Sequence, residues 1–185
     1  MRKLIIFNQV TLDGFFADAK GDMGWAHKSD PEWNEFVGAN ASGGGMLLFG
    51  RKTYQMMASY WPTPYAMHDN PDVAQGMNAL PKVVFSKTLK KATWNNTRLV
   101  KRGLTAEVRK LKQGTGEAMV VLGSGSIVSQ LALEGLVDEF QLVINPLVLG
   151  KGKPLFMGLR KPLALGLLDP RRFKNGNVLM RYAPA

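Results

Sequence analysis

Short apolar segments alternate with helical segments along the first 140 residues, and this alternation limits the fold more than any other feature. Val, Ile, Leu and Phe dominate the apolar segments, which have the length and composition of buried strands. These segments are 3–9, 46–49, 82–86, 97–101 and 118–123. Strands that alternate with helices favour an α/β fold, in which helices cover a mostly parallel sheet.

Helices are predicted between these strands, at about 31–42, 52–59, 105–113 and 126–136. Asp30 can cap the first helix and Pro31 suits its first position. Residues 11–30 are expected to form a long loop. Residues 60–80 are rich in Pro, Asn and Asp, and an irregular excursion is expected there.

The last third of the chain has a different pattern, which predicts antiparallel strands. Residues 139–150 form one long apolar segment that Pro146 interrupts, and the tail from about 163 has the pattern of paired strands. Asn175-Gly176 is a strong signal for a tight hairpin. With 185 residues, of which 45% are hydrophobic, we expect a single domain over 1–185 with an antiparallel hairpin at the edge of its sheet.

The chain has no cysteine and only two histidines, His27 and His68, in predicted loops. Disulfides, thiolate nucleophiles and cysteine-ligated metals are therefore excluded, and we predict no metal site. The lack of cysteine fits a reducing compartment, so a cytoplasmic location is expected. No run of about 18 apolar residues occurs, so no membrane-spanning segment is predicted.

Basic residues exceed acidic ones, with 24 Lys and Arg against 14 Asp and Glu, so the formal net charge is +10. This excess favours an anionic partner, which can be a nucleic acid, a membrane surface or a phosphorylated small molecule. The cations are spread along the chain without a long block of one sign, as on an ordinary solvated surface. No recognisable nucleic-acid-binding motif is found, so a nucleic-acid partner is not expected.

Three predicted strands end in turns that carry glycine, hydroxyl or cationic side chains. These turns are Gly50-Arg51-Lys52-Thr53, Ser86-Lys87-Thr88 and Gly123-Ser124-Gly125-Ser126, named here the 50–53 turn, the 86–88 turn and the 123–126 turn. Ligands of open α/β sheets bind beyond the carboxyl ends of the strands. Glycine lets a phosphate approach the main chain, and arginine and lysine bind its oxygens. Each turn alone can be an ordinary polar turn, but together they favour a ligand with several phosphates, such as a dinucleotide.

Other common phosphate and nucleophile motifs are absent from the sequence. A Rossmann fingerprint needs a third glycine where the chain has Val128, and there is no Walker A motif. There is no G-x-S-x-G elbow, so Ser124 is a poor candidate for a nucleophile. No pair of carboxylates suggests glycoside chemistry.

Taken jointly, these segments resemble the dihydrofolate reductase-like superfamily, in particular the branch similar to the C-terminal reductase domain of the riboflavin-biosynthesis deaminase/reductase. The resemblance rests on Asp13-Gly14-Phe15 and on LFGRKTY, VVFSKT, LGSGSI and EGLVDEFQLVINPLVLGKGKPLF. It runs over nearly the whole chain and is weakest in residues 60–80. It implies a three-layer α/β/α sandwich with a mixed, mostly parallel sheet of about eight strands. It also implies NADPH as cofactor and, often, a homodimer.

The resemblance also assigns residues to the cofactor. Its phosphates are expected against Gly50, Arg51, Lys52 and Thr53, and its adenosine 2′-phosphate near Ser86 and Lys87, with Thr88 nearby. Its pyrophosphate is expected at a helix start formed by Gly123, Ser124, Gly125, Ser126 and Ile127. A side chain at position 125 is expected to occupy the path of the phosphate. The nicotinamide is expected beside Asp13 and Gly14.

Two carboxylates are the candidates for catalysis, Glu32 and Asp13. In classical dihydrofolate reductases a carboxylate on the first helix interacts with the pterin, and Glu32 is the position most like it, counting back from Phe36. Burial there is expected to raise the pKa of Glu32 and suit it to proton transfer. Glu32 also lies in a first helical turn, where any acid stabilises the helix dipole. Asp30 and Glu35 are rivals for the same role.

The sequence therefore predicts an NADPH-dependent reductase that transfers hydride to a small heterocyclic or ribosylamino-pyrimidine-like substrate. No deaminase zinc motif is present, so the chain is at most the reductase half of the bifunctional enzyme. A phosphorylated substrate needs a further phosphate site, for which Lys151, Lys153 and Arg160 are candidates. Two alternatives stay open, a nucleotide-binding protein without catalysis and a basic nucleic-acid-binding protein.

Overall fold

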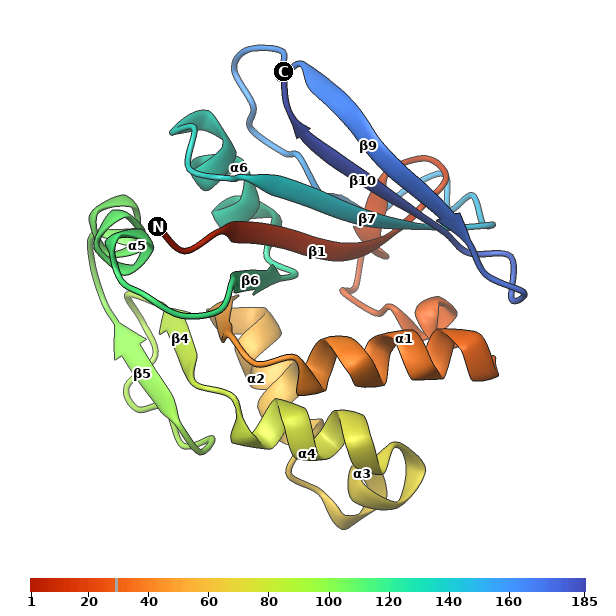
Figure 1. The fold of residues 1–185 in the computed structure, drawn as a ribbon, viewed down its shortest axis with the longest axis horizontal. Helices are drawn as coiled ribbons and strands as arrows, with labels where there is room; N and C mark the ends of the chain where they lie inside the picture. Colours follow the sequence, from red (N-terminus) through yellow and green to blue (C-terminus); the bar gives the residue numbers. More distant parts are fainter. Residues whose placement is uncertain (29) are drawn as a thin grey trace.

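The computed structural model describes residues 1–28 and 30–185. Within these residues, eight strands form one sheet in the order β5-β4-β3-β6-β1-β7-β10-β9 (Figure 1). The strands are β1 (Leu4–Thr11), β3 (Met46–Gly50), β4 (Lys82–Phe85), β5 (Thr97–Val100), β6 (Met119–Leu122), β7 (Glu139–Asn145), β9 (Leu165–Arg172) and β10 (Val178–Pro184). The strands from β5 to β7 in this order run parallel, while β10 lies antiparallel to both β7 and β9. The predicted mixed sheet with an antiparallel C-terminal hairpin is confirmed.

Helices cover both faces of this sheet (Figure 1). They are α1 (Pro31–Ser42), α2 (Arg51–Tyr60), α3 (Pro64–Asp69), α4 (Pro71–Ala79), α5 (Leu104–Gln113) and α6 (Gly125–Leu133). Buried Val108 of α5 and Ile127 of α6 pack in one core cluster, whereas Trp33 of α1, Tyr54 of α2 and Met77 of α4 pack in two others. The predicted three-layer α/β/α sandwich is confirmed.

Side-chain alternation along β1 explains why the sheet needs both helical layers. Leu4 and Ile6 face the cluster that contains α5 and α6, whereas Phe7 packs with Trp33 of α1 on the opposite face. Successive residues of a strand point to opposite faces, so a strand with apolar residues at consecutive positions needs cover on both sides. Burying one such side chain fully stabilises the fold by roughly 2 kcal/mol.

The three turns lie next to one another because their strands do. β4, β3 and β6 are neighbours in the sheet and run parallel, so the turns that follow them meet at its carboxyl edge. α2 begins at Arg51, directly after the last residue of β3. Between β6 and α6, Gly123 and Ser124 both adopt left-handed backbone conformations, with φ of 62° and 61°. The chain therefore reverses within two residues at this edge.

The expectation for residues 60–80 was wrong, because this segment contains α3 and α4 rather than irregular chain. Pro64 and Pro71 each occupy the start of a helix. The Thr63 hydroxyl caps α3 by accepting a hydrogen bond from the Ala66 N–H at 3.2 Å. Proline breaks a helix in its interior but is favoured in the first turn, where no N–H partner is needed.

A second, small sheet pairs part of the segment expected as a long loop with residues much further along the chain. β2 (Phe15–Ala17) pairs with β8 (Lys153–Pro154), and a short 3-10 helix covers Gly24–Ala26. Segments of two or three residues carry no periodic signal in the sequence. Their pairing ties the loop after β1 to the chain that follows β7.

The start of α1 lies against the hairpin between β9 and β10. The Asp30 carboxylate caps α1 by accepting from the Glu32 N–H at 3.0 Å and also accepts from the Asn175 N–H at 2.9 Å. Pro31 is the first residue of the helix, as expected. Gly176 has a φ of 89°, so the predicted turn between the last two strands is confirmed. These contacts bring β9 to the same edge as the three turns.

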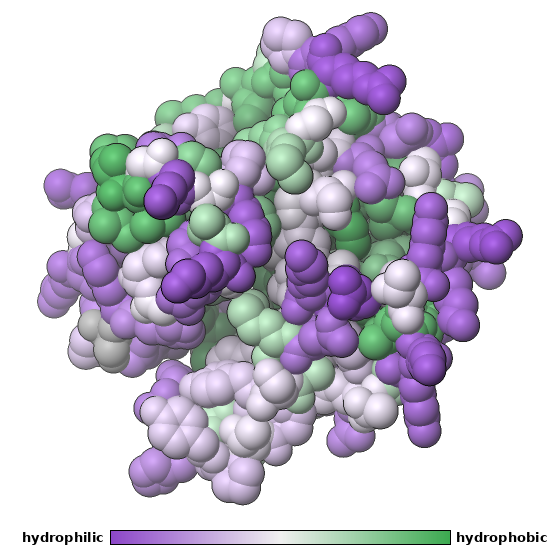
Figure 2. All heavy atoms as spheres, turned by 180° about the vertical axis from the view of Figure 1, so that it is seen from behind, coloured by the Kyte–Doolittle hydropathy of each residue, from purple (hydrophilic) through white to green (hydrophobic). Residues whose placement is uncertain are grey.

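Hydrophilic side chains surround the rear face of the molecule, with paler and apolar groups between them (Figure 2). Across the described part of the chain, no helix has both the length and the apolar character needed to cross a bilayer.

Candidate cofactor site

The 50–53 turn and the 123–126 turn are joined directly by hydrogen bonds. The Gly50 N–H donates to Ser124 Oγ at 3.0 Å, and Ser124 Oγ lies 3.0 Å from Thr53 Oγ1 in a second hydrogen bond. Residues more than 70 positions apart in the chain thus form one unit at the carboxyl edge. Strands in a sheet are 4.7–4.9 Å apart, so the row of strand ends from β4 to β1 spans roughly 14 Å. Ligands of open α/β sheets bind along such a row of strand ends.

Two glycines permit this close approach. A Cβ atom on Gly50 would lie 2.4 Å from Ser124 Oγ, and one on Gly123 would lie 2.7 Å from Thr53 Oγ1. Both distances are too short for real side chains, so these positions need glycine for contact between the turns as well as for any ligand.

Gly125 requires a correction. We expected a side chain there to occupy the path of a phosphate, but its Cβ would point into the protein. That atom would lie 2.9 Å from the Leu155 carbonyl oxygen, 3.1 Å from that of Pro154, and 3.3 Å from the Phe16 ring. Packing against the segment around β8 therefore accounts for glycine at this position. Ile127 likewise contributes its buried side chain to the core and leaves only its main chain near the turn.

Two helices begin at the joined turns, α2 at Arg51 and α6 at Gly125. The first N–H groups of a helix have no partner within the helix, and the helix dipole adds positive potential there. Two helix starts next to each other therefore form a site suited to an anion.

The cations of the turns have no acidic partner. Arg51 donates to the Gln55 side chain at 3.1 Å, and Lys52 and Lys87 are exposed. The ion pairs formed by the described residues include none of the three. The positive charge of these three side chains is therefore not neutralised by an acidic side chain of the described residues.

Ser86 shapes the 86–88 turn. Its hydroxyl oxygen accepts from the Thr88 N–H at 3.2 Å and from the Leu89 N–H at 2.9 Å. These bonds leave the side chains of Lys87 and Thr88 exposed beyond the end of β4. The turn therefore presents a single cation beside the 50–53 turn.

Asp13 holds two loops together at the ends of β1 and β7. Its carboxylate accepts from the Thr11 hydroxyl at 2.6 Å, from the Leu149 N–H at 3.2 Å and from the Gly150 N–H at 2.8 Å. The hydrogen bond from Thr11, with those from Gly150 and Leu149, lowers the pKa of Asp13 below its ordinary value. A carboxylate that is ionised and bonded in this way is a poor proton donor. Gly14 follows with a φ of 82°, which turns the chain into β2.

Glu32 is paired rather than desolvated, contrary to our expectation. Its Oε1 accepts from Arg171 Nη2 at 3.1 Å, and 35% of its side chain is exposed. The Arg171 guanidinium also stacks on two rings, with its carbon 5.4 Å from the centre of Phe36 and 4.9 Å from that of Phe173. Arg171 had no signal in the sequence, because it reaches Glu32 only through the β9–β10 hairpin.

Neither rival carboxylate replaces Glu32. Asp30 is buried as the cap of α1, with both oxygens accepting from backbone N–H groups. Glu35 is exposed on α1 and lines a hollow against α4. Glu32 therefore stays the candidate that lies beside the carboxyl edge with its carboxylate partly free.

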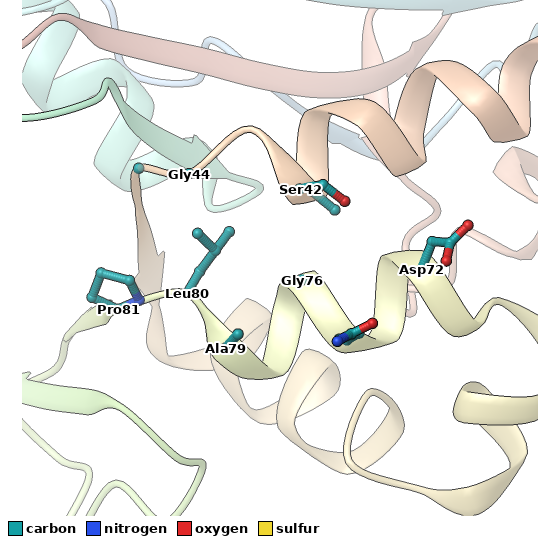
Figure 3. A pocket seen from close by; sticks show the side chains of 10 residues that line it. Ser42, Gly44, Asp72, Gly76, Ala79, Leu80 and Pro81 are labelled. Atoms are coloured by element: carbon teal, nitrogen blue, oxygen red, sulfur yellow. The ribbon is translucent and has the colours of Figure 1, made fainter.

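A hollow of about 460 Å³ between α1 and α4 lies elsewhere in the fold (Figure 3). Gly44 and Leu80, which line it, come just before β3 and β4, so it opens at the amino edge of the sheet. The three turns lie at the other end of the same strands. This hollow is thus separate from the candidate cofactor site.

Comparison with known proteins identifies the family. The model of the RibD C-terminal domain matches residues 2–179. The chain belongs to the RibD C-terminal domain family. The expected branch of the dihydrofolate reductase-like superfamily is thereby confirmed.

Three relatives illustrate how this RibD-type chain compares with known proteins. It is 31% identical to the uncharacterized protein YyaP of Bacillus subtilis over 98% of this chain and 94% of that protein. It is 23% identical to a putative riboflavin biosynthesis protein of Shewanella sp. PV-4, with a TM-score of 0.75 over 99% of both chains. A dihydrofolate reductase of Enterococcus faecalis complexed with NADP(H) has a TM-score of 0.67 at 13% identity, over 98% of this chain and 96% of that one. The two solved structures share the fold of the RibD-type chain.

Proposed function

We propose that this chain is an NADPH-dependent reductase that transfers hydride to a small heterocyclic or ribosylamino-pyrimidine-like substrate. One observation carries the proposal: two helix starts are joined by hydrogen bonds at adjacent strand ends, beside cations that lack acidic partners. A polyphosphate is the kind of ligand that such an arrangement binds. The dihydrofolate reductase of Enterococcus faecalis, which shares this fold, is complexed with NADP(H), and this supports a nicotinamide dinucleotide as that ligand.

The residues at the edge fit a coenzyme with a pyrophosphate and a 2′-phosphate. The main chain of 123–126, with Arg51, Lys52 and Thr53, would hold the pyrophosphate region, and Lys87 the 2′-phosphate. The bound coenzyme supplies the hydride, and the protein supplies position and charge.

On the substrate side, we assign Glu32 as the group that receives the substrate. Its Oε1 is oriented by Arg171, whereas no donor among residues 1–28 and 30–185 occupies its Oε2. A ring nitrogen or amino group of a heterocycle can donate to that oxygen. Asp13 has an indirect role, because its hydrogen bonds fix the loop that would place Gly14 beside the coenzyme.

A second candidate function is nucleotide binding without catalysis. It is favoured by the state of the two candidate acids, since Glu32 is ion-paired and Asp13 accepts three hydrogen bonds. Asp13, whose pKa is lowered, is not the kind of acid that general acid catalysis uses, and the Glu32 carboxylate is held by a cation. A panel of pyrimidine and pterin substrates separates the two, because only the reductase consumes NADPH.

Titration of NADPH and NADH against the purified protein, followed by coenzyme fluorescence, tests the proposal. We expect saturable binding of both coenzymes, with an affinity for NADPH about tenfold higher. The reason is that a cation beside the 2′-phosphate contributes about 1.4 kcal/mol to the binding free energy. Absence of NADPH binding would overturn the proposal. If salt-sensitive binding to DNA were found in its place, the nucleic-acid alternative would be favoured.

We also propose that two copies associate through β9. This strand is one of the two outer strands of the sheet, and seven of its eight residues are exposed, including Leu167 at 54% and Leu168 at 53%. An outer strand has free backbone groups that can pair with another chain. Light scattering after size exclusion is expected to give a dimer, and Leu168→Glu a monomer. A monomeric parent would exclude this arrangement.

A further inference from the structure

We propose that Ser124 and Thr53 act as one positioning pair, which sets the distance between the two phosphate turns and offers a single hydroxyl proton to the ligand. This inference rests on the proposed binding of NADPH. It gives Ser124 a role through its side chain, in addition to any contact of its main chain with phosphate.

The backbone of Ser124 indicates that its side chain is needed. Ser124 has φ 61° and ψ 73°, and among the described residues only Asn96 is another non-glycine residue with a positive φ. Asparagine tolerates this conformation, whereas for other residues it costs roughly 1–2 kcal/mol. Such strain persists only where surrounding contacts impose it. The contacts of the Ser124 side chain are the hydrogen bonds of its hydroxyl to Gly50 and Thr53.

One hydroxyl proton of the pair has no acceptor among the described residues. The Gly50 N–H uses one acceptor position of Ser124 Oγ, and one of the two hydroxyls donates to the other. Neither hydroxyl has a further partner in the described chain. Two O–H protons and one mutual bond leave one O–H free, whichever hydroxyl is the donor within the pair. An anionic oxygen at the helix starts is the strongest acceptor for it.

The distance between the turns is fixed from both sides. Glycine at 50 and 123 lets the turns come together, since a Cβ at either position would collide with the hydroxyl of the opposite turn. The two hydrogen bonds of Ser124 then prevent the turns from moving apart. Thr53 is only 8% exposed, so it is held in place by packing as well.

A double-mutant cycle tests the pair. Ser124→Gly removes the hydroxyl and suits the left-handed backbone, and Thr53→Val removes the other hydroxyl at nearly constant volume. We expect each to weaken NADPH binding roughly tenfold by fluorescence titration, which is the loss of one charge-assisted hydrogen bond with its positioning. Because the hydroxyls act as a unit, the double variant should bind about as weakly as either single variant.

Two further variants serve as controls. Thr53→Ser keeps the hydroxyl and should restore binding to within about threefold of the parent. Ser59→Ala removes a hydroxyl of the same helix that bonds the Met56 carbonyl at 2.8 Å, far from the turns, and should leave NADPH affinity unchanged. Urea unfolding of all variants checks that each is folded.

The outcomes distinguish this inference from the proposed function. If the parent binds NADPH and both single variants bind equally well, the positioning pair is wrong while the reductase proposal survives. Losses that add to about a hundredfold would make the hydroxyls two independent ligands and would also overturn the pair. A parent that does not bind NADPH overturns the proposed function itself, and this inference with it.

Discussion

Lysine side chains have different environments at the two edges of the sheet. At the amino edge, Lys82 begins β4 and is only 1% exposed. Its ammonium donates to the carbonyls of Asn78, Leu80 and Asn95 at 3.1, 2.6 and 3.1 Å and lies 4.5 Å from the centre of the Trp94 ring. At the carboxyl edge, no ion pair of the described residues involves Lys52 or Lys87.

A second cation at the amino edge is also bound by the protein. Lys112 pairs with Asp138 and donates to the Leu136 carbonyl at 2.8 Å. Asp138 also accepts from the N–H of Leu4, at the start of β1, at 2.7 Å. The amino edge thus uses these cations to stabilise strand starts, whereas the cations of the three turns at the carboxyl edge have no acidic partner among the described residues. The net charge of +10 does not distinguish these uses, because the same residue types serve both.

The largest effect is expected at the amino edge. Lys82→Met should lower the free energy of unfolding by about 3 kcal/mol, because three buried carbonyls lose their donor. NADPH affinity should not change, since the ammonium lies at the end of the strand away from the turns. Urea unfolding and fluorescence titration measure the two quantities. A large loss of NADPH affinity in a folded variant would contradict the claim that Lys82 serves stability and not binding.

The buried ammonium of Lys82 should also make the free energy of unfolding depend on pH in the alkaline range. Burial lowers the pKa of Lys82 to about 8, below its ordinary value of 10.5. Between these values the unfolded chain binds more protons than the native protein, so the contribution of Lys82 to stability rises with pH. The difference in unfolding free energy between the parent and Lys82→Met should therefore widen from pH 8 to pH 10. A constant difference would contradict the shift.

At the carboxyl edge, Lys87→Glu should weaken NADPH binding about a hundredfold and NADH binding only a few-fold, since only NADPH carries the 2′-phosphate. Lys110→Glu is the matched control, because it changes the net charge equally on the exposed surface of α5. Equal losses for the two coenzymes would remove Lys87 from the 2′-phosphate.

Gly125→Val tests whether glycine at this position is needed for packing within the protein or for binding the coenzyme. Because its Cβ would lie 2.9 Å from the Leu155 carbonyl oxygen, we expect a loss of about 2 kcal/mol in unfolding free energy. Gly38→Val is the control, since its Cβ would meet only the Asp72 Cβ, at the ordinary contact distance of 3.9 Å. An undiminished stability with lost NADPH binding would restore the original explanation for Gly125.

The smallest effect is expected from Asp13→Asn. The lowered pKa of Asp13 means that its carboxylate contributes stability above the ordinary pKa of 3.8, and that this contribution is lost as the pH falls through the folded value. Parent and variant should differ modestly at neutral pH and converge in acid. Amide exchange at Leu149 and Gly150 should quicken in the variant. Loss of nearly all turnover at unchanged loop protection would instead make Asp13 the proton donor.

Local patterns in the sequence predicted much of the framework. Apolar strands ending in the three turns located the candidate site, because parallel strands bring their carboxyl ends to one edge. Asp30 with Pro31, and Asn175 with Gly176, marked a helix start and a hairpin through backbone preferences that act over a few residues. The helices α3 and α4 were missed, since a proline that starts a helix and one that ends it look alike without their neighbours.

What the sequence alone determined is therefore the order of strands and helices and the chemical character of the strand ends. Only the tertiary structure decided which cationic side chains are bound by protein groups, that Arg171 contacts Glu32, and that Ser124 contacts Thr53. The physical reason is range: hydrogen bonds, ion pairs and steric contacts act over a few ångströms between groups that the chain separates by 71 to 139 residues. Lys82 and Lys87, five positions apart, look alike as letters, and only folding buries one and exposes the other.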